Sequence, residues 1–329
     1  MKNIVKIFFL MIYLQGLVGC CGCSKTPEKP SVPSNTSTTN QPALSGRLIF
    51  HSYSCYSCND SKLYIYDFAA NTIANISSGW TINNVMNAHF SPDGKRIVFM
   101  GIPANTNNWD IFIWSVGSTL QPTNITAAFG STRDEDPKFS NSGNEIIFKQ
   151  NGRMKEMDTL GNIVRSFTVS QAEASMPFYI KGDTAVLYSG NATSGSAAGV
   201  FKLSLFSNSI QMISALPGVE AYYPIVRDDT SFLFTRWVST TNHNDQIYLG
   251  FLNGKAAWCL SFNEADQNFS DAYPVNSNYV ILSSTKPGGK GGYDLYIADI
   301  FTGQKWSLDL YNAAINSTIH QLGAGYTNY

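Results

Sequence analysis

Five segments of the chain repeat one pattern, and this repetition limits the possible folds more than any other feature of the sequence. Each is a short strand opening, a polar turn and an apolar strand: NAHFSPDGKRIVF from Asn87, EDPKFSNSGNEIIF from Glu135, SMPFYIKGDTAVLY from Ser175, YYPIVRDDTSFLF from Tyr222 and AYPVNSNYVILSS from Ala272. Alignment on Ala88, Pro137, Pro177, Pro224 and Pro274 gives spacings of 49, 40, 47 and 50 residues. Strand-rich repeats of this length indicate the blades of a β-propeller.

The two ends of the chain decide how the ring closes. Strands between Arg47 and about Ile76 supply one more blade, but this blade lacks an innermost strand. One further period beyond Pro274 reaches Ala324, so we expect the segment 319–329 to complete blade 1, with the segment 42–44 as the alternative. Closure of this kind removes an exposed sheet edge. The sequence therefore predicts an all-β fold, a single propeller over residues 46–329 with six four-stranded blades.

Composition agrees with strands and argues against two classes of partner. Charged residues make up 14% of the chain, well below the roughly 25% that is usual, and aromatic residues reach 13%. Aromatic side chains favour strands. The formal net charge of −1 gives no basic surface of the kind that binds nucleic acid or acidic lipid, so neither is expected as a partner.

Specific motifs in the repeats resemble the TolB-type propeller family. Ser91-Pro92-Asp93-Gly94-Lys95 resembles the family's turn, and DLYIAD, residues 294–299, resembles its outer strand. ILSSTKPGGKGGYDLYIAD, residues 281–299, is similar to propeller repeats that accompany OmpA-like peptidoglycan-binding proteins in Bacteroidota. The turn Asn141-Ser142-Gly143 departs from the pattern, and the fourth repeat has no Asp-Gly pair. The resemblance implies a TolB-like propeller whose partner is a peptidoglycan-associated lipoprotein of OmpA type.

The N-terminus predicts export and a lipid anchor. Lys2 and Lys6 precede an apolar run over residues 7–14, which is too short to span a bilayer. The run Leu17-Val18-Gly19-Cys20 resembles a bacterial lipobox, so residues 1–19 are expected to be a lipoprotein signal peptide and Cys20 the acylated, palmitate-bearing residue. An ordinary signal peptide cut near Gly19 is the alternative. Residues 20–45, rich in Ser, Thr, Pro and Asn, are expected to form a flexible tether.

The predicted location is the outer membrane. Cys21 rather than Asp follows the anchor, which by resemblance to the sorting rule of enteric bacteria disfavours retention at the inner membrane. Whether the protein faces the periplasm or the cell surface stays open.

Acidic residues precede the innermost strand in four repeats and form the candidate binding site. They are Asp134, Glu135, Asp136, Glu173, Glu220 and Asp271, and aromatic residues that include Tyr223 and Tyr273 flank them. Strand entries of a propeller surround one mouth of the central channel, so converging carboxylates there predict binding of a cationic or polar partner. The alternative is that each acid caps its own turn.

Other polar motifs favour structural roles. The four histidines have no ligand-like spacing, so no metal site is expected. Cys55 and Cys58, in an exported chain, predict a loop-closing disulfide or two free thiols rather than a redox centre. Cys259 is expected to be buried, and the Pro287–Gly292 segment to be a mobile hairpin loop without phosphate-loop spacing.

Catalysis is disfavoured, because the sequence has no Gly-x-Ser-x-Gly elbow and no visible nucleophile. The sequence therefore predicts a non-catalytic binding or scaffold module without a cofactor, engaging an envelope protein. A glycan-binding or polysaccharide-degrading propeller lipoprotein is the alternative.

Overall fold

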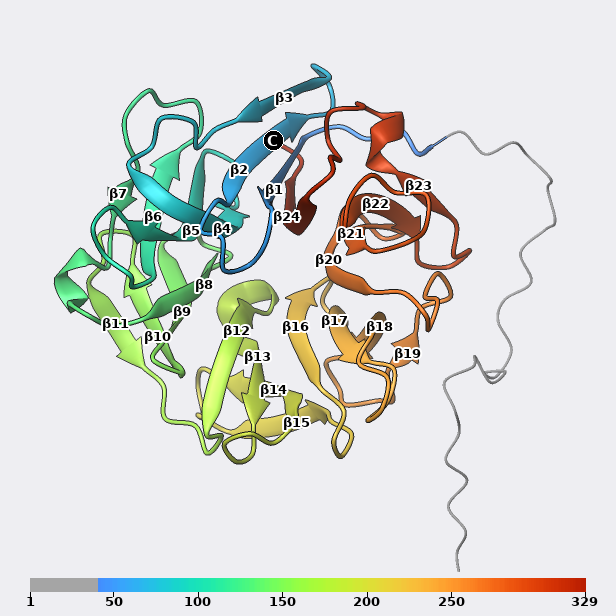
Figure 1. The fold of residues 1–329 in the computed structure, drawn as a ribbon. Coiled ribbons are helices and arrows are strands. Elements are labelled where there is room, and N and C mark those ends of the chain that lie inside the picture. Colours follow the sequence, from blue (N-terminus) through green and yellow to red (C-terminus); the bar gives the residue numbers. More distant parts are fainter. Residues whose placement is uncertain (1–40) are drawn as a thin grey trace, which may run out of the picture.

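The protein is a ring of six blades around a central channel (Figure 1). This computed structural model describes residues 41–329; the predicted signal peptide, Cys20 and most of the predicted tether lie outside that range. Each blade is a four-stranded antiparallel sheet, which confirms the predicted fold and the number of blades. The helices of the described chain are three single 3₁₀ turns, at Ala127–Phe129, Lys181–Asp183 and Leu308–Leu310.

The first three blades, from the channel outward, are built as follows. Blade 1 contains β24 (His320–Thr327), β1 (Arg47–Tyr53), β2 (Lys62–Asp67) and β3 (Thr72–Asn75). Blade 2 contains β4 (Ile82–Phe90), β5 (Arg96–Pro103), β6 (Asp110–Ser115) and β7 (Thr123–Asn124). Blade 3 contains β8 (Asp134–Phe139), β9 (Glu145–Gln150), β10 (Arg153–Asp158) and β11 (Ile163–Ser166).

The other three blades repeat this order. Blade 4 contains β12 (Glu173–Tyr179), β13 (Ala185–Asn191), β14 (Ala198–Ser204) and β15 (Ile210–Ser214). Blade 5 contains β16 (Ala221–Val226), β17 (Ser231–Trp237), β18 (Asp245–Phe251) and β19 (Trp258–Cys259). Blade 6 contains β20 (Phe269–Pro274), β21 (Tyr279–Ser284), β22 (Asp294–Asp299) and β23 (Lys305–Ser307).

The C-terminal strand closes the ring, as predicted. β24 pairs antiparallel with β1, and Tyr326 lies opposite Leu48 (Figure 1). The alternative closing segment, Pro42 to Leu44, forms no strand; instead, the Pro42 carbonyl accepts a hydrogen bond from the Tyr311 hydroxyl, on the blade 6 side. The two ends of the described chain therefore meet in blade 1, and the last strand of the sequence is the innermost strand of the first blade.

The hydrophobic core of the described residues contains one cluster at each of the six junctions between neighbouring blades, and a smaller seventh cluster lies within blade 2. Leu48 and Phe50 of blade 1 pack with Ile281 and Leu295 of blade 6, for example, and Ala324 of the closing strand belongs to the same cluster. Equivalent clusters lie at the other five junctions. Because every blade buries both of its faces, strand residues on both faces are apolar, and polar side chains collect at the channel and at the loops.

Arginine side chains join neighbouring blades at the turns between the first and second strands. The guanidinium of Arg96 in blade 2 donates to the Gly143 carbonyl in the turn of blade 3 at 2.8 Å and lies 5.3 Å from the centre of the Phe139 ring. The same bond to the next blade's turn recurs in three places: Arg47 to Gly94, Arg96 to Gly143 and Arg227 to Ser277. We call this side of the ring the turn face, and the opposite side, where the innermost strands begin, the entry face.

Every innermost strand contains a bulge at the same position. The bulged residue has positive φ in each blade, and the six residues are Asn87, Asp136, Met176, Tyr223, Asp271 and Gly323. The pairing with the neighbouring strand shifts register at each of them. Asn, Asp and Gly tolerate this backbone region best, and they occupy four of the six positions.

The bulges also correct the alignment of the fifth repeat. The residue after each bulge is Ala88, Pro137, Pro177, Pro224, Ala272 and Ala324. The equivalent residue in blade 6 is thus Ala272 rather than Pro274, because proline occurs two positions later in that strand.

Candidate functional site

Two rings of side chains line the channel. The bulged residue faces the axis, and the residue two positions later faces it again because side chains alternate along a strand. The residue between them packs into the blade junctions, as Ala88, Ala272 and Ala324 do. The residues at this second position are His89, Lys138, Phe178, Ile225, Tyr273 and Gly325, and the glycine contributes no side chain.

Three side chains from alternate blades meet at the axis and form a plug. His89 of blade 2 lies edge-on to Phe178 of blade 4, with ring centres 5.4 Å apart, and its Nε2 is 3.3 Å from the hydroxyl of Tyr273 of blade 6. The Phe139 N–H donates to His89 Nδ1 at 3.1 Å, so the ring proton is on Nε2 and is donated to Tyr273. Burial, followed by the charge of Lys138, holds the His89 pKa well below its usual value, so the ring stays neutral. Tyr273 thus lies at the plug and not at the mouth, where the sequence had placed it.

A buried charge cluster lies beside the plug. Asp136 of blade 3 accepts a 2.9 Å hydrogen bond from Asn87, and Asp271 of the opposite blade 6 accepts one from the Gly323 N–H at 3.1 Å. Burial raises the pKa of both carboxyls. Lys138 is only 6% exposed, interacts electrostatically with both carboxylates, and donates its one hydrogen bond among the described residues to the Pro137 carbonyl at 3.3 Å. Burial lowers the Lys138 pKa to about 8.

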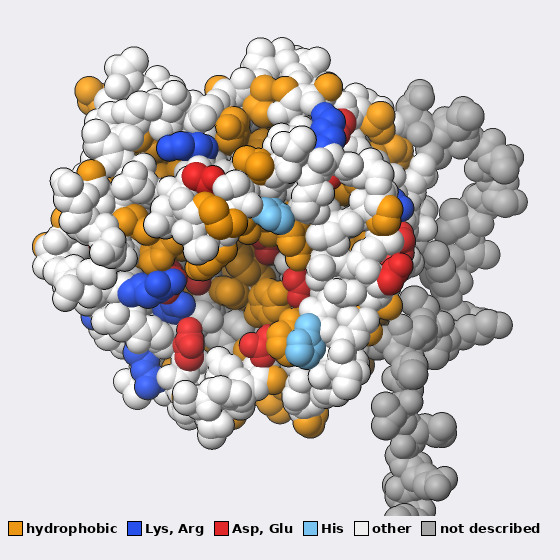
Figure 2. All heavy atoms as spheres, in the orientation of Figure 1, with side chains coloured by type: hydrophobic (Ala, Val, Ile, Leu, Met, Phe, Trp, Pro, Cys, Tyr) orange, Lys and Arg blue, Asp and Glu red, His pale blue; other side chains and the backbone are white. Residues whose placement is uncertain are grey.

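Aromatic residues form the wall of the entry face near blades 1 and 6. His51, Tyr53, His320 and Tyr293 make a continuous series of ring contacts with centres 5.3–5.9 Å apart. Tyr223 is the bulged residue of blade 5. Burial, followed by the negative charges of Asp271 and Asp136, raises the pKa of its hydroxyl well above the usual value. The face drawn in Figure 2 is hollowed at the centre of the ring; acidic, hydrophobic and histidine side chains surround the hollow, and a group of Lys or Arg side chains lies close to it on the left.

Cys55 and Cys58 form a disulfide in the loop between β1 and β2. The bond encloses Tyr56, whose side chain is 60% exposed and interacts with Tyr53 and Arg133. The disulfide therefore restrains a loop at the entry face.

Two of the predicted binding acids are used inside blade 3. Asp134 is fully buried and accepts hydrogen bonds from Gln150 Nε2 at 2.9 Å and from the Thr132 hydroxyl at 3.1 Å. Glu135 is buried between Arg133, 2.6 Å away, and Lys149, 2.8 Å away. Burial alone would raise the Glu135 pKa, but the hydrogen bond from Arg133 and the charge of Lys149 outweigh it and lower the pKa. These carboxylates are thus occupied by side chains of nearby residues, and not by the main-chain N–H groups that the capping of a turn would use.

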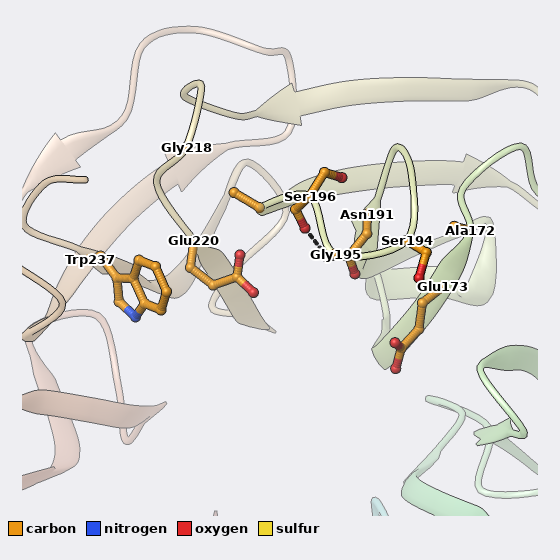
Figure 3. A pocket seen from close by; sticks show the side chains of 10 residues that line it. Ala172, Glu173, Asn191, Ser194, Gly195, Ser196, Gly218, Glu220 and Trp237 are labelled. Atoms are coloured by element: carbon orange, nitrogen blue, oxygen red, sulfur yellow. Dashed lines mark hydrogen bonds between the residues drawn. The ribbon is translucent and has the colours of Figure 1, made fainter. Parts of the chain in front are cut away.

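Glu173 and Glu220 remain available to a ligand. They line a cavity of about 510 Å³ on the entry face, between blades 4 and 5, together with Trp237 and the loop 194–197 (Figure 3). Glu220 accepts a hydrogen bond from the Ala198 N–H through Oε2 at 2.6 Å. Glu173 is 49% exposed and lies 3.4 Å from Lys149, which is closer to Glu135. A second cavity, of about 420 Å³, lies on the turn face below the plug.

Asp245 is a buried acid of blade 5 at the entry face, and sequence reasoning missed it. The Tyr222 hydroxyl donates to Asp245 Oδ1 at 2.6 Å. Burial, with a contribution from the charge of Asp271, raises the Asp245 pKa to about 6. The folded protein therefore binds a proton at Asp245 more tightly than the unfolded chain does.

Replacement of Asp245 by Asn is expected to stabilise the protein at neutral pH. Because the folded-state pKa is raised, the native state loses stability as pH rises from about 4 to about 6, and the full cost is present above that. A shift of roughly two units corresponds to about 2–3 kcal/mol, and Asn keeps an acceptor for Tyr222. Thermal denaturation at pH 4 and pH 7.5 checks this, with Asp229→Asn on the turn face as the control. Equal effects of Asp245→Asn at both pH values would contradict the prediction.

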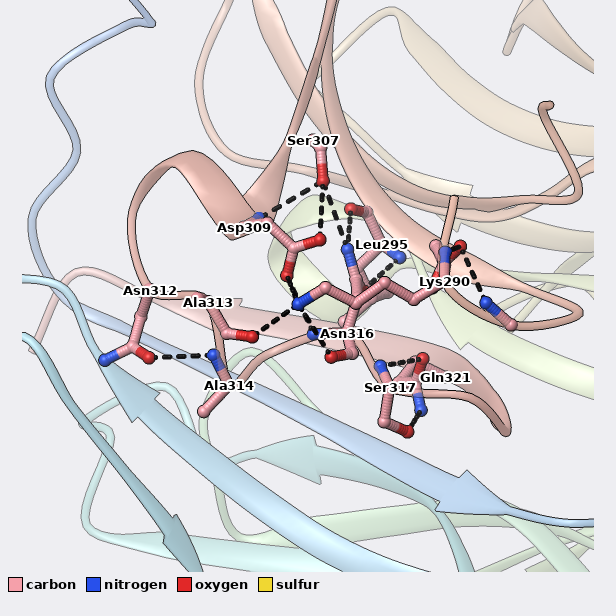
Figure 4. Close-up of polar contacts among 12 residues, drawn as sticks. Lys290, Leu295, Ser307, Asp309, Asn312, Ala313, Ala314, Asn316, Ser317 and Gln321 are labelled. Carbon is pink, nitrogen blue, oxygen red and sulfur yellow. Dashed lines mark hydrogen bonds and ion pairs between the residues drawn. The ribbon is translucent and has the colours of Figure 1, made fainter. Parts of the chain in front are cut away.

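One further sequence prediction is wrong. Cys259 lies on the outermost strand β19 and is exposed, because that edge of blade 5 faces away from the core. In the Pro287–Gly292 loop, whose mobility stays a prediction, the ammonium of Lys290 contacts Asp309 Oδ1 at 3.0 Å and the carbonyls of Ala313 at 2.5 Å and Asn316 at 3.3 Å (Figure 4).

Residues 41–329 contain neither a cluster of metal-binding side chains nor a membrane-spanning helix. Within that range, no group of three or more His, Cys, Asp or Glu side chains is arranged to hold a metal ion. No helix in the same range has the length and apolar character needed to cross a membrane.

Comparison with known proteins identifies the fold. No family model matches the sequence, and no curated protein matches it. Among solved structures, TolB from Acinetobacter baumannii aligns with a TM-score of 0.65 at 14% identity, over 87% of this chain and 67% of that one. A proposed TolB from Agrobacterium tumefaciens aligns with a TM-score of 0.58 at 12% identity, over 86% and 98% of the two chains.

The architecture is also part of larger proteins. Hydrazine synthase from Kuenenia stuttgartiensis aligns with a TM-score of 0.65 at 11% identity, over 87% of this chain and 47% of that one. Identities this low show likeness of fold alone. Blade number, strand order and these alignments together show that residues 41–329 form a TolB-like, six-bladed β-propeller.

Proposed function

We propose that the chain is an outer-membrane lipoprotein, anchored through Cys20, whose propeller binds another envelope protein at the entry face without catalysing a reaction. The partner class that we propose is an OmpA-like, peptidoglycan-associated protein. Support for this class comes from the resemblance of residues 281–299 to repeats that accompany such proteins and from the TolB-like fold.

The observation that carries the proposal is the contrast between the two faces. On the entry face, Glu173, Glu220 and Trp237 line the cavity between blades 4 and 5, and Tyr56 is exposed in the loop that the disulfide closes. On the turn face, by contrast, the arginines hold neighbouring blades together. The plug of His89, Phe178 and Tyr273 obstructs passage along the axis. Such a ring is suited to present one surface to a partner.

The second candidate function is glycan binding, and Trp237 favours it. An indole beside two carboxylates can also hold a sugar, because the ring stacks on the apolar face of a pyranose while acids accept hydrogen bonds from its hydroxyls. Glu173 and Glu220 would then act as ligand-orienting acids.

Capture of partners from detergent-solubilised envelopes tests the main proposal. The double variant Glu173→Gln, Glu220→Gln is expected to capture its partner about tenfold more weakly, because each rim charge contributes roughly 0.5–1 kcal/mol. Capture should also weaken with salt. Asp271 is left unchanged because it is built into the channel, and Asp229→Asn on the turn face is the matched control. Undiminished capture by the double variant at high salt would contradict an entry-face site.

A further inference from the structure

The cavity between blades 4 and 5 combines features that select one kind of side chain. Glu173 begins the innermost strand of blade 4, and Glu220 immediately precedes that of blade 5, so the two acids reach the cavity from adjacent blades. In Figure 3 the Glu220 carboxylate lies beside the Trp237 ring, and Glu173 lies across the cavity. The remaining lining is small and polar, with Asn191 and the loop 194–197. The cavity is thus open in the centre and acidic on two sides.

A second aromatic ring packs against the indole of Trp237. His243 stacks on it with ring centres 4.0 Å apart and planes 17° from parallel. His243 covers one face of the indole, while the Trp237 side chain lines the cavity. A ring fixed in this way offers a flat, electron-rich surface at low entropic cost.

The surrounding charges leave this cavity negative. Glu135 takes the closer bond to Lys149, so Lys149 neutralises Glu173 only in part. Glu220 has one hydrogen bond, to a main-chain N–H, and no cation within 4.0 Å among the described residues. The channel next to the cavity holds two buried carboxylates, Asp136 and Asp271, against the single cation of Lys138. A cation entering here would be attracted by the four carboxylates Glu173, Glu220, Asp136 and Asp271, and the repulsion from Lys138 and Lys149 would offset only part of this attraction.

We propose that this cavity binds an arginine side chain of the protein partner, with the guanidinium paired with Glu220 and stacked on Trp237, and with Glu173 across the cavity adding negative charge. The inference rests on the proposed function, because it names the chemistry by which the entry face recognises its partner. Arginine fits better than lysine: its planar, weakly hydrated group can pair with carboxylates and stack on an aromatic ring at the same time.

A peptide titration followed at Trp237 tests the proposal directly. The probes are acetylated, amidated Gly-Ser-Arg-Ser-Gly and its lysine and citrulline versions; citrulline has nearly the same shape as arginine but no charge. The indole N–H resonance of Trp237, assigned by its loss in Trp237→Phe, reports binding in the cavity itself. The arginine peptide is expected to bind at least about tenfold more tightly than the citrulline peptide, and the lysine peptide to fall between them.

Matched variants separate charge from shape. Glu173→Gln with Glu220→Gln should remove the preference for arginine over citrulline while the indole resonance stays in its folded position. Asp229→Asn, on the turn face, should keep the preference. Equal binding of the arginine and citrulline peptides to the unmodified protein would overturn the proposal, as would an unchanged preference in the double variant. A shift of the indole resonance by a neutral chitin tetrasaccharide but not by the arginine peptide would also overturn it and favour a glycan.

Partner capture distinguishes failure of this inference from failure of the proposed function. If the envelope partner is captured and the arginine and citrulline peptides displace it from the propeller equally well, only the assignment of arginine fails. Capture that is unaffected by the glutamine variants would instead remove the entry face as the binding surface.

Discussion

A protein that lacks residues 320–329 is expected to have no stable native state. The deletion removes β24, the innermost strand of blade 1, and leaves the inner edge of β1 without hydrogen-bond partners. It also removes Leu322 and Tyr326, and burial of large apolar side chains contributes about 1.5–3 kcal/mol each. With the strand's hydrogen bonds, the loss approaches the total stability of a typical domain, about 5–15 kcal/mol.

Circular dichroism and thermal denaturation measure this effect. The matched control lacks only Asn328 and Tyr329, which follow β24 and are exposed. This shorter deletion loses a hydrogen bond from Arg47 to the Tyr329 carbonyl but keeps the strand, so its melting temperature should fall by only a few degrees. A cooperative transition near the normal temperature in the longer deletion would mean that β24 does not hold the ring closed.

Replacement of Glu135 by Ala is expected to destabilise the protein by about 3–5 kcal/mol at pH 7. Glu135 is the shared partner of Arg133 and Lys149, and Lys149 is 15% exposed. Removal of the carboxylate leaves a largely buried ammonium close to the channel, and breaking a buried ion pair from one side costs about this much. Denaturant unfolding of the variant gives the value.

Two measurements show whether charge is the cause. Lys149→Met in the Glu135→Ala background should recover part of the lost stability, because it removes a largely buried cation whose remaining partner is the half-exposed Glu173, 3.4 Å away; a double-mutant cycle gives the coupling. The folded-state pKa of Glu135 is lowered, so its contribution is present above the unfolded value near 4.5 and is lost as pH falls through the folded value. A cost of Glu135→Ala that is equal at pH 3 and pH 7, with no recovery in the double variant, would point to packing instead.

The fold could be predicted because the same strand and turn pattern occurs in several repeats, so that an irregularity in one repeat does not hide it. Polar turns before apolar strands recur five times, and their period placed the closing strand at Ala324, which is equivalent to Ala88 in the structure. Strand topology depends on this average spacing, so the two-residue misalignment at Pro274 did not change the number of blades.

The direction of individual side chains was harder to predict, because one bulged residue changes which side chains face the channel. Asp136 and Asp271 are turned to the axis by positive φ, whereas Asp134 stays inside its blade. Asn, Asp or Gly at the bulge position in four blades was the available signal. Trp237 and Lys138 gave no comparable signal: Trp237 reaches the cavity only through long-range folding, and Lys138 lies in a strand where lysine usually indicates a solvated position.

The Lys290 ammonium has a consequence for how blade 6 responds to its surroundings. It sits among a carboxylate oxygen of Asp309 and the main-chain carbonyls of Ala313 and Asn316, a set of oxygen atoms that in other loops surrounds a bound metal ion (Figure 4). Here the cation is part of the polypeptide: it is made in a one-to-one ratio with its site, cannot be exchanged, and is beyond the reach of chelators. The chain's own ammonium group therefore holds these oxygen atoms together in the way that a bound cation does elsewhere.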